Sequence, residues 1–135
     1  MSGYSGKPLA AKLGIKPGFR LAAIDPPAHY FALVDPLPAA VTWHAAEAGL
    51  LDCIHLFVTA SADLERQLGA LRSRIVQNGM IWVSWPKRSA KVPTDVTEDH
   101  IRRLALAIGL VDVKVCAVDA IWSGLKLVIP VAQRL

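Results

Sequence analysis

The sequence predicts one three-layer α/β domain over residues 1–135, with a mostly parallel sheet, helices on both faces and an antiparallel hairpin at its C-terminal end. Its 135 residues suit one domain, and a hydrophobic fraction of 53% suits central strands that are covered on both faces. Strand-like apolar runs alternate with segments of helical periodicity, as in a parallel sheet. Two strand-like runs in succession then close the chain, which predicts the hairpin.

The N-terminal part begins with residues 1–7, which we expect to be flexible, and continues with a short helix and a first strand. Pro8 can open the helix, because a first turn does not need the amide proton that proline lacks, and Gly14 can end it. Residues 19–24 form an apolar strand, which Asp25-Pro26-Pro27 ends because proline cannot donate to a sheet ladder. A short helix and a weak second strand are expected at residues 28–34 and 41–44.

The middle of the chain supplies the centre of the predicted sheet. Residues 52–59 are a nearly continuous apolar run, which predicts a buried parallel strand. Ser61 fits the N-cap of the following helix, because its hydroxyl can accept from a free backbone amide. The buried face of that helix is expected to comprise Leu64, Leu68, Leu71 and Ile75. Asn78-Gly79 is predicted to break the helix, and residues 80–85 form a second central strand.

The C-terminal part predicts one more helix and the hairpin. Asp95 and Glu98 have the spacing of a capping box, in which each side chain bonds the other's backbone amide. The helix that they open is closed by Gly109. Two strands then follow at residues 111–118 and 125–129, joined by the linker 119–124.

Composition and charge argue against several classes of protein. Charged residues break every apolar run before the roughly 18 residues that a membrane span needs, and no secretory signal is recognisable, so we expect the cytoplasm. The net charge of +4 is modest and its positive residues are scattered, which argues against nucleic acid as a partner. Cys53 and Cys116 lie within apolar runs, so we expect buried, inert thiols.

Candidate ligand-binding residues lie beyond the strand ends. Ligands of open parallel sheets bind at the carboxyl ends of the strands, which places residues 25–30, 59–61 and 84–91 on one rim. The last segment carries Trp85, Lys87 and Arg88, which could offer an anion an aromatic wall and cationic donors before a helix start. The alternative is a solvated basic loop with Trp85 packed beneath it.

The candidate catalytic residues are Asp25 and His29. His29 lies on the rim, and an imidazole can exchange protons near neutral pH. His55 lies within an apolar strand, where a hydrogen-bonded core residue is expected. The four histidines are dispersed without a spaced cysteine or carboxylate, so we predict no metal site.

The order of elements resembles the class I S-adenosylmethionine-dependent methyltransferase (Rossmann-like) fold in a trimmed form. The clearest local match is residues 71–83, which resemble that family's passage from a helix through a glycine turn into its fifth strand. Several motifs also resemble an uncharacterised bacterial family, domain of unknown function number 3052, over nearly the full length. These motifs are Gly3-Tyr4-Ser5-Gly6 and residues 12–18, 55–59, 82–87 and 122–126.

Two departures from the methyltransferase pattern concern the cofactor. The resemblance implies a glycine-rich turn after the first strand and an acid after the second, which would contact S-adenosylmethionine. This chain has Asp25-Pro26-Pro27 at the first place, and its nearest acid after the second strand is Glu47. S-adenosylmethionine is therefore possible but not favoured as a cofactor.

Three hypotheses remain open. The first is a non-catalytic or regulatory methyltransferase-like domain that binds a small anionic ligand or a protein partner at the rim. The second is a small enzyme, S-adenosylmethionine-dependent or another transferase, with a non-standard cofactor loop. The third is a homo-oligomerisation or interaction module, in which Trp122 and the terminal strand offer an edge for pairing.

Overall fold

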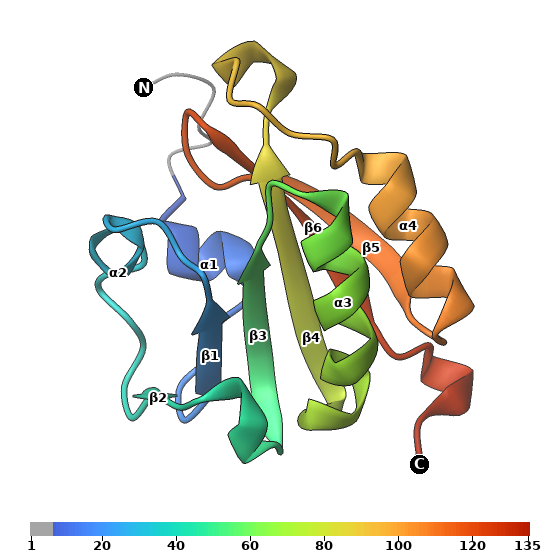
Figure 1. The fold of residues 1–135 in the computed structure, drawn as a ribbon. Coiled ribbons are helices and arrows are strands. Elements are labelled where there is room, and N and C mark those ends of the chain that lie inside the picture. The colour runs from blue at the N-terminus through green and yellow to red at the C-terminus, as the bar shows by residue number, and fades with distance from the viewer. Residues whose placement is uncertain (1–6) are drawn as a thin grey trace.

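The computed structural model describes residues 7–135 as a single mixed sheet with helices on both faces (Figure 1). The expected flexible start and the motif at residues 3–6 fall on residues 1–6, outside the described part. The sheet has six strands in the order β2-β1-β3-β4-β6-β5. These strands are β1 (Arg20–Ile24), β2 (Thr42–Trp43), β3 (Leu51–Phe57), β4 (Ile75–Pro86), β5 (Val111–Ala117) and β6 (Trp122–Val128).

The first four strands are mutually parallel, and the last two are antiparallel to their neighbours. This pattern confirms the predicted mostly parallel sheet with a C-terminal hairpin. The helices are α1 (Leu9–Leu13), α2 (Tyr30–Leu33), α3 (Ser61–Leu71) and α4 (Glu98–Ala107). Short 3-10 helices are η1 (Ala46–Ala48), η2 (Arg72–Arg74), η3 (Arg88–Ala90) and η4 (Val131–Gln133).

Two hydrophobic clusters make the three layers. One cluster joins α3 and α4 to one face of the sheet and includes Leu68 and Ile101. The other joins α1 and α2 to the opposite face and includes Leu13 and Tyr30. Figure 1 shows α3 and α4 together on the near face of the sheet. We call the two sides the α3/α4 face and the α1/α2 face.

The C-terminal part of strand β4 is enclosed on both faces and both edges. Its residues from Gly79 to Pro86 are all buried, because both faces are covered and both edges are paired. Alternate side chains therefore enter opposite clusters: Trp82 lies on the α1/α2 face and Val83 on the α3/α4 face. The Trp82 indole Nε1 donates to the Leu13 carbonyl at 3.0 Å, which ties α1 to the sheet.

The predicted helix break at Asn78-Gly79 is wrong. Helix α3 ends at Leu71 and continues as η2, and Asn78 and Gly79 lie inside β4. Ile75 already pairs with Leu51, so the strand begins earlier than its apolar run suggests. Gly79 serves a close backbone approach instead, since a Cβ there would lie 3.1 Å from the Asp52 carbonyl oxygen.

The predicted capping box is also wrong, although α4 is present. Thr97 caps α4, and its hydroxyl oxygen accepts from the His100 backbone amide at 3.1 Å. The Asp95 carboxylate accepts instead from the backbone amide and hydroxyl of Ser61, each at 2.7 Å. Ser61 is consequently the first residue of α3, with Ala60 at the N-cap. Asp95 thus stabilises the start of a different helix.

The hairpin differs from the prediction in its place and in its turn. Strand β6 begins at Trp122, so part of the predicted linker is strand. It lies between β4 and β5, which means that the terminal strand is not an edge available for pairing. The edge on this side is β5, where Val113 and Val115 are about half exposed.

No helix among residues 7–135 is long and apolar enough to cross a membrane.

Removing Leu68 is expected to destabilise the fold strongly. This side chain is 1% exposed under α3, so Leu68→Ala removes buried methyl groups and leaves a cavity. We expect urea denaturation to show a loss of about 2–5 kcal/mol in the free energy of unfolding. The matched control is Leu106→Ala on α4, whose side chain is 57% exposed, with an expected change of about 0.5 kcal/mol or less. Equal effects of the two variants would contradict the described core.

Candidate functional site

The carboxyl ends of β1, β3 and β4 lie next to one another at one edge of the sheet, as the parallel pairings require. They point to the top of Figure 1. The segments that leave them, together with the turn between β5 and β6, form what we call the rim. That turn belongs to the rim because the Lys87 backbone amide donates to the Ile121 carbonyl at 2.7 Å. The three segments predicted to share one edge therefore do so.

A buried polar chain crosses the α1/α2 face just below the rim. The Tyr30 hydroxyl lies 2.9 Å from Nδ1 of His55, and Nε2 of His55 lies 2.7 Å from the Ser84 hydroxyl. All three side chains are at most 2% exposed. The Tyr30 ring packs against the His55 imidazole and against Phe57, and Phe57 packs against Trp122. The ring centroids in each of these pairs lie about 5 Å apart. This arrangement fixes α2 over the strand ends.

His55 is therefore a hydrogen-bonded core residue, as predicted. Burial lowers the pKa of His55 to about 3, so the ring stays neutral at physiological pH. Burial also raises the pKa of Tyr30 well above its ordinary value. The expected burial of both thiols is confirmed, and burial raises the pKa of Cys53 to about 12. Buried neutral groups of this kind stabilise the fold and are poorly suited to proton exchange with a ligand.

His29 lies on the rim and contacts a residue far away in sequence. Its Nε2 lies 2.7 Å from Oδ2 of Asp119, in the β5–β6 turn. The other oxygen of Asp119 accepts from the backbone amides of Ile121 and Trp122, at 2.8 and 2.7 Å. Burial raises the pKa of Asp119, but the His29 and backbone hydrogen bonds outweigh it, so the pKa lies below its ordinary value. The carboxylate is thus ionised and held in one orientation.

Asp25, the second predicted catalytic residue, directly follows β1 and has a left-handed backbone at φ 53°. In the described chain no hydrogen bond joins its side chain to His29. The acid that His29 contacts is Asp119 instead. The catalytic role of Asp25 stays a prediction without a described contact to support it.

The three predicted ligand-binding residues divide between the two faces. Trp85 and Arg88 line a cavity of about 410 Å³ on the α3/α4 side of the rim. Lys87 lies toward the other face, where its Nζ donates to the Asp119 backbone carbonyl at 2.6 Å. The remaining cavity lining is Pro86, Val92, Thr94, Val96, Thr97 and Glu98. Lys87 follows the last residue of β4 and Arg88 begins η3, so the chain turns between them and the two side chains separate.

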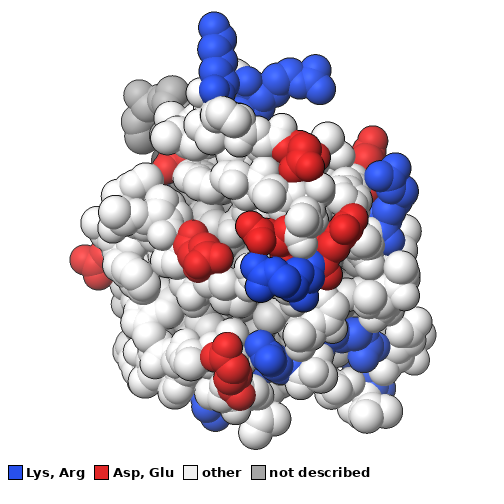
Figure 2. All heavy atoms as spheres, in the orientation of Figure 1, with Lys and Arg blue, Asp and Glu red and all other residues white. Residues whose placement is uncertain are grey.

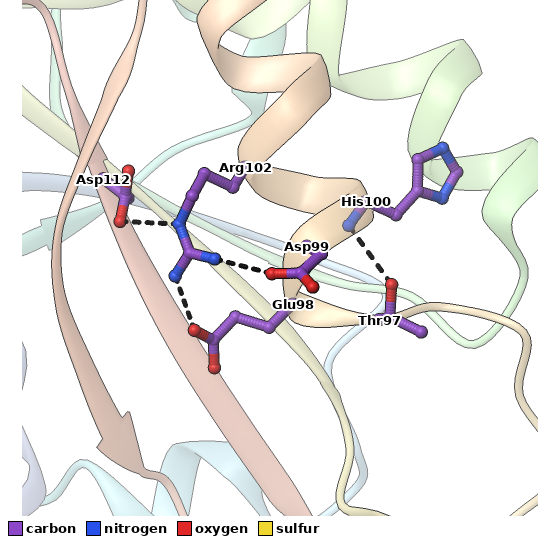
Figure 3. A network of polar contacts seen from close by, with 6 residues as sticks. All are labelled: Thr97, Glu98, Asp99, His100, Arg102 and Asp112. Carbon is purple, nitrogen blue, oxygen red and sulfur yellow. Dashed lines mark hydrogen bonds and ion pairs between the residues drawn. The ribbon is translucent and has the colours of Figure 1, made fainter.

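The start of α4 carries a charge network beside this cavity (Figure 3). Arg102 contacts Glu98 and lies 2.9 Å from carboxylate oxygens of both Asp99 and Asp112. The hydrogen bonds that Arg102 donates to Glu98 and Asp112 raise the pKa of Arg102. Glu98 lines the cavity while it is paired with a guanidinium, so its charge there is partly compensated.

The sequence does not predict the partners in the two polar arrangements described above. These arrangements are the His29–Asp119 contact and the buried polar chain through His55. Asp119 was treated as a turn residue, and its contact with His29 spans 90 positions. Tyr30 and Ser84 lie in segments that the sequence places on the rim, but their hydrogen bonds to His55 are not predicted. A single sequence has no local signal for such pairings, because they depend on the strand order. Among residues 7–135 no cluster of three or more metal-ligating side chains is found.

Comparison of the sequence with known protein families and with characterised proteins finds no match. Solved structures do match in fold. A ribosomal protein L11 methylase from Lactobacillus delbrueckii subsp. bulgaricus is 13% identical with a TM-score of 0.60, covering 88% of this chain and 73% of that chain. The magnesium protoporphyrin IX methyltransferase of Synechocystis PCC 6803 with bound SAM is 12% identical with a TM-score of 0.61, covering 89% and 74%.

A third similar structure is the Aeropyrum pernix fibrillarin with natively bound S-adenosyl-L-methionine. It is 14% identical with a TM-score of 0.57, covering 93% of this chain and 70% of that chain. At such identities the likeness concerns the fold alone. The fold of this chain is accordingly Rossmann-like and of the methyltransferase type.

The residues of this chain do not fit S-adenosylmethionine in the mode that the resemblance implies. In place of a glycine turn, Pro26 and Pro27 follow β1 and offer no backbone donor. Behind them Tyr30 is packed into the aromatic cluster at 2% exposure. Strand β2 ends with Trp43, where the resemblance implies an acid, and the Trp43 ring centroid lies 6.1 Å from that of Tyr30. The chain's own side chains occupy this part of the rim.

The buried His55 is expected to make stability fall in acid. Between about pH 6 and pH 3 the unfolded chain binds a proton at residue 55 that the folded chain does not, so the free energy of unfolding falls as the pH falls. The slope from this residue is at most about 1.4 kcal/mol per pH unit. Urea denaturation across this pH range gives the free energy of unfolding of the unmodified protein and of His55→Gln. The difference between the two slopes against pH is the contribution of His55.

His44→Gln, at a partly exposed position, is the control and is expected to keep the slope of the unmodified protein. If His55→Gln does not fold, NMR of the His55 ring gives a second measurement. A ring that takes up its proton near pH 6.5 would contradict the described burial.

Proposed function

We propose that this chain is a methyltransferase-like domain that binds a small anionic ligand at the rim and does not transfer methyl groups. The observation that supports the proposal most directly is the cavity of about 410 Å³ beside Trp85 and Arg88. Small-molecule sites commonly have volumes of about 300–1,000 Å³. The cavity lies where open parallel sheets bind their ligands, beyond the carboxyl end of β4.

The chemistry of the lining favours a ligand with both an apolar and an anionic part. Trp85 gives an aromatic wall, and Val92 and Val96 add apolar surface. Arg88 has no acidic partner among the described residues, so its guanidinium is available to a carboxylate or a phosphate. Figure 2 shows basic side chains projecting at the top of the molecule, where Figure 1 places the segment after β4. Glu98 is the one acid of the lining, and Arg102 pairs with it.

The opposite side of the rim supports the proposal that the chain does not transfer methyl groups. Pro26 and Pro27 take the place of the implied glycine turn, and the anchored Tyr30 lies behind them. Opening this region would break the Tyr30–His55 hydrogen bond and expose the aromatic cluster. The ligand we propose therefore binds on the α3/α4 side, away from this packing.

Membership of the uncharacterised bacterial family number 3052 is also part of the proposal. Three of the motifs that carry this resemblance meet near the rim. They include His55 of the buried polar chain, Lys87 beside the β5–β6 turn and Trp122 at the start of β6. This convergence supports a shared site in the family.

A protein partner is a second candidate, and the open edge of β5 favours it. Val113 and Val115 are 54% and 49% exposed on a strand with one unpaired side. A second copy of the chain could pair there. Sedimentation over a range of concentrations tests this, and a monomer at every concentration would exclude it.

S-adenosylmethionine and S-adenosylhomocysteine are expected to leave thermal stability unchanged. A ligand at 100 times its dissociation constant would add about 2.7 kcal/mol to the free energy of unfolding, an effect that a thermal-shift measurement detects readily. A selective rise with either compound would contradict the proposal and favour an enzyme with a non-standard cofactor loop.

Small anions are expected to stabilise the protein through Arg88. We would measure thermal shifts with three anions. Inorganic phosphate has no ring, benzoate has a single ring, and adenosine monophosphate is a nucleotide. At least one is expected to raise the melting temperature, and Arg88→Gln is expected to abolish that rise. Arg103→Gln, on the exposed side of α4, is the matched control and keeps the response. The absence of any rise, or an equal loss in both variants, would overturn the proposed site.

A further inference from the structure

The contact between His29 and Asp119 is built differently from an incidental surface ion pair. The Asp119 side chain is 12% exposed, and its Oδ1 is held by two backbone amides of its own turn. Lys87 fixes the same turn from β4, through its side chain on the Asp119 carbonyl and its amide on the Ile121 carbonyl. The oxygen that faces His29 therefore has little freedom to move.

This fixed carboxylate determines where the imidazole carries its proton. Because an ionised carboxylate only accepts, the 2.7 Å contact requires a proton on Nε2 of His29. In the neutral ring Nδ1 is then the basic nitrogen. In the described chain Nδ1 has no hydrogen-bond partner, and the His29 side chain is 49% exposed. An oriented imidazole with one free, partly exposed nitrogen meets the first requirement of a general base.

The other histidines lack one or more of these features. Both nitrogens of His55 are engaged in the core. His44 bonds the Thr42 hydroxyl. His100 also contacts a carboxylate, but Glu65 is 56% exposed and the contact is 3.2 Å long. The His100–Glu65 pair is thus a natural comparison within the same chain.

We propose that His29 is a general base at the rim, positioned by Asp119, and that it activates water toward small activated carboxylic esters. In the described chain no serine hydroxyl or cysteine thiol bonds the free nitrogen, so water is the nucleophile. Nδ1 takes a proton from water, the water oxygen bonds to the ester carbonyl carbon, and the ester C–O bond breaks as the alkoxide leaves. Asp119 stabilises the imidazolium, which then returns its proton to the leaving group or to solvent. This inference does not depend on the cavity beside Trp85.

The test is hydrolysis of 4-nitrophenyl acetate by the purified full chain. We expect release of 4-nitrophenolate above the buffer rate, a loss of about 100-fold or more in His29→Ala, and a loss of about tenfold or more in Asp119→Asn. Added imidazole is expected to restore part of the rate in His29→Ala, which a purely structural role of His29 would not produce. Circular dichroism and melting temperature show whether each variant remains folded.

His100→Ala and Glu65→Gln are the matched controls, and both are expected to keep the full rate. Hydrolysis by the unmodified protein that equals that of His29→Ala would overturn the proposal. Equal losses in His29→Ala and His100→Ala would overturn it as well, because the reaction would then reflect surface imidazoles in general. Should Asp119→Asn unfold, the rate and imidazole rescue of His29→Ala decide the question alone. Since no anion is added, failure here is distinct from failure of the anion site.

Discussion

The enclosure of β4 from Gly79 to Pro86 is the constraint on which most of this structure depends. Strands β3 and β6 pair with its two edges, and hydrophobic clusters cover its two faces. This part of the strand has no solvent-exposed side, so each of its side chains must suit one of two interiors. Trp82 meets this demand by donating its indole proton to the Leu13 carbonyl, and Ser84 does so by bonding His55. The strand then delivers Trp85, Lys87 and Arg88 to the rim.

The polar chain from Tyr30 to Ser84 shows how a methyltransferase-type scaffold can be closed by its own side chains. The adjacent residues His29 and Tyr30 are anchored in different places, one to the β5–β6 turn and the other to β3. A buried polar group is costly unless it is satisfied, and here each member has a partner. The anchoring fills one side of the rim and leaves the cavity on the other.

Much of the fold could be predicted from local patterns in the sequence. The central strand and the leucines of α3 were identified correctly, since burial imposes a periodicity on neighbouring residues. Predictions failed where a residue serves a distant segment. Asp95 has the spacing of a cap for its own helix but bonds Ser61, and Gly79 permits a close approach to Asp52 instead of ending a helix. For the site, Trp85 and His29 could be placed on the rim, whereas Asp119 could not be assigned to His29 without the strand order.

The passage from β4 into η3 has a consequence for how the rim can change over time. Lys87 and Arg88 are neighbours in sequence, yet one contacts the β5–β6 turn and the other lines the cavity on the opposite side. A substitution at either position alters one side only. Inserting or deleting a single residue just before them would displace both side chains at once, because they leave the same strand end one after the other. The length of this strand end is therefore under tighter constraint than the identity of its residues, and natural variants should tolerate replacements there more readily than gaps.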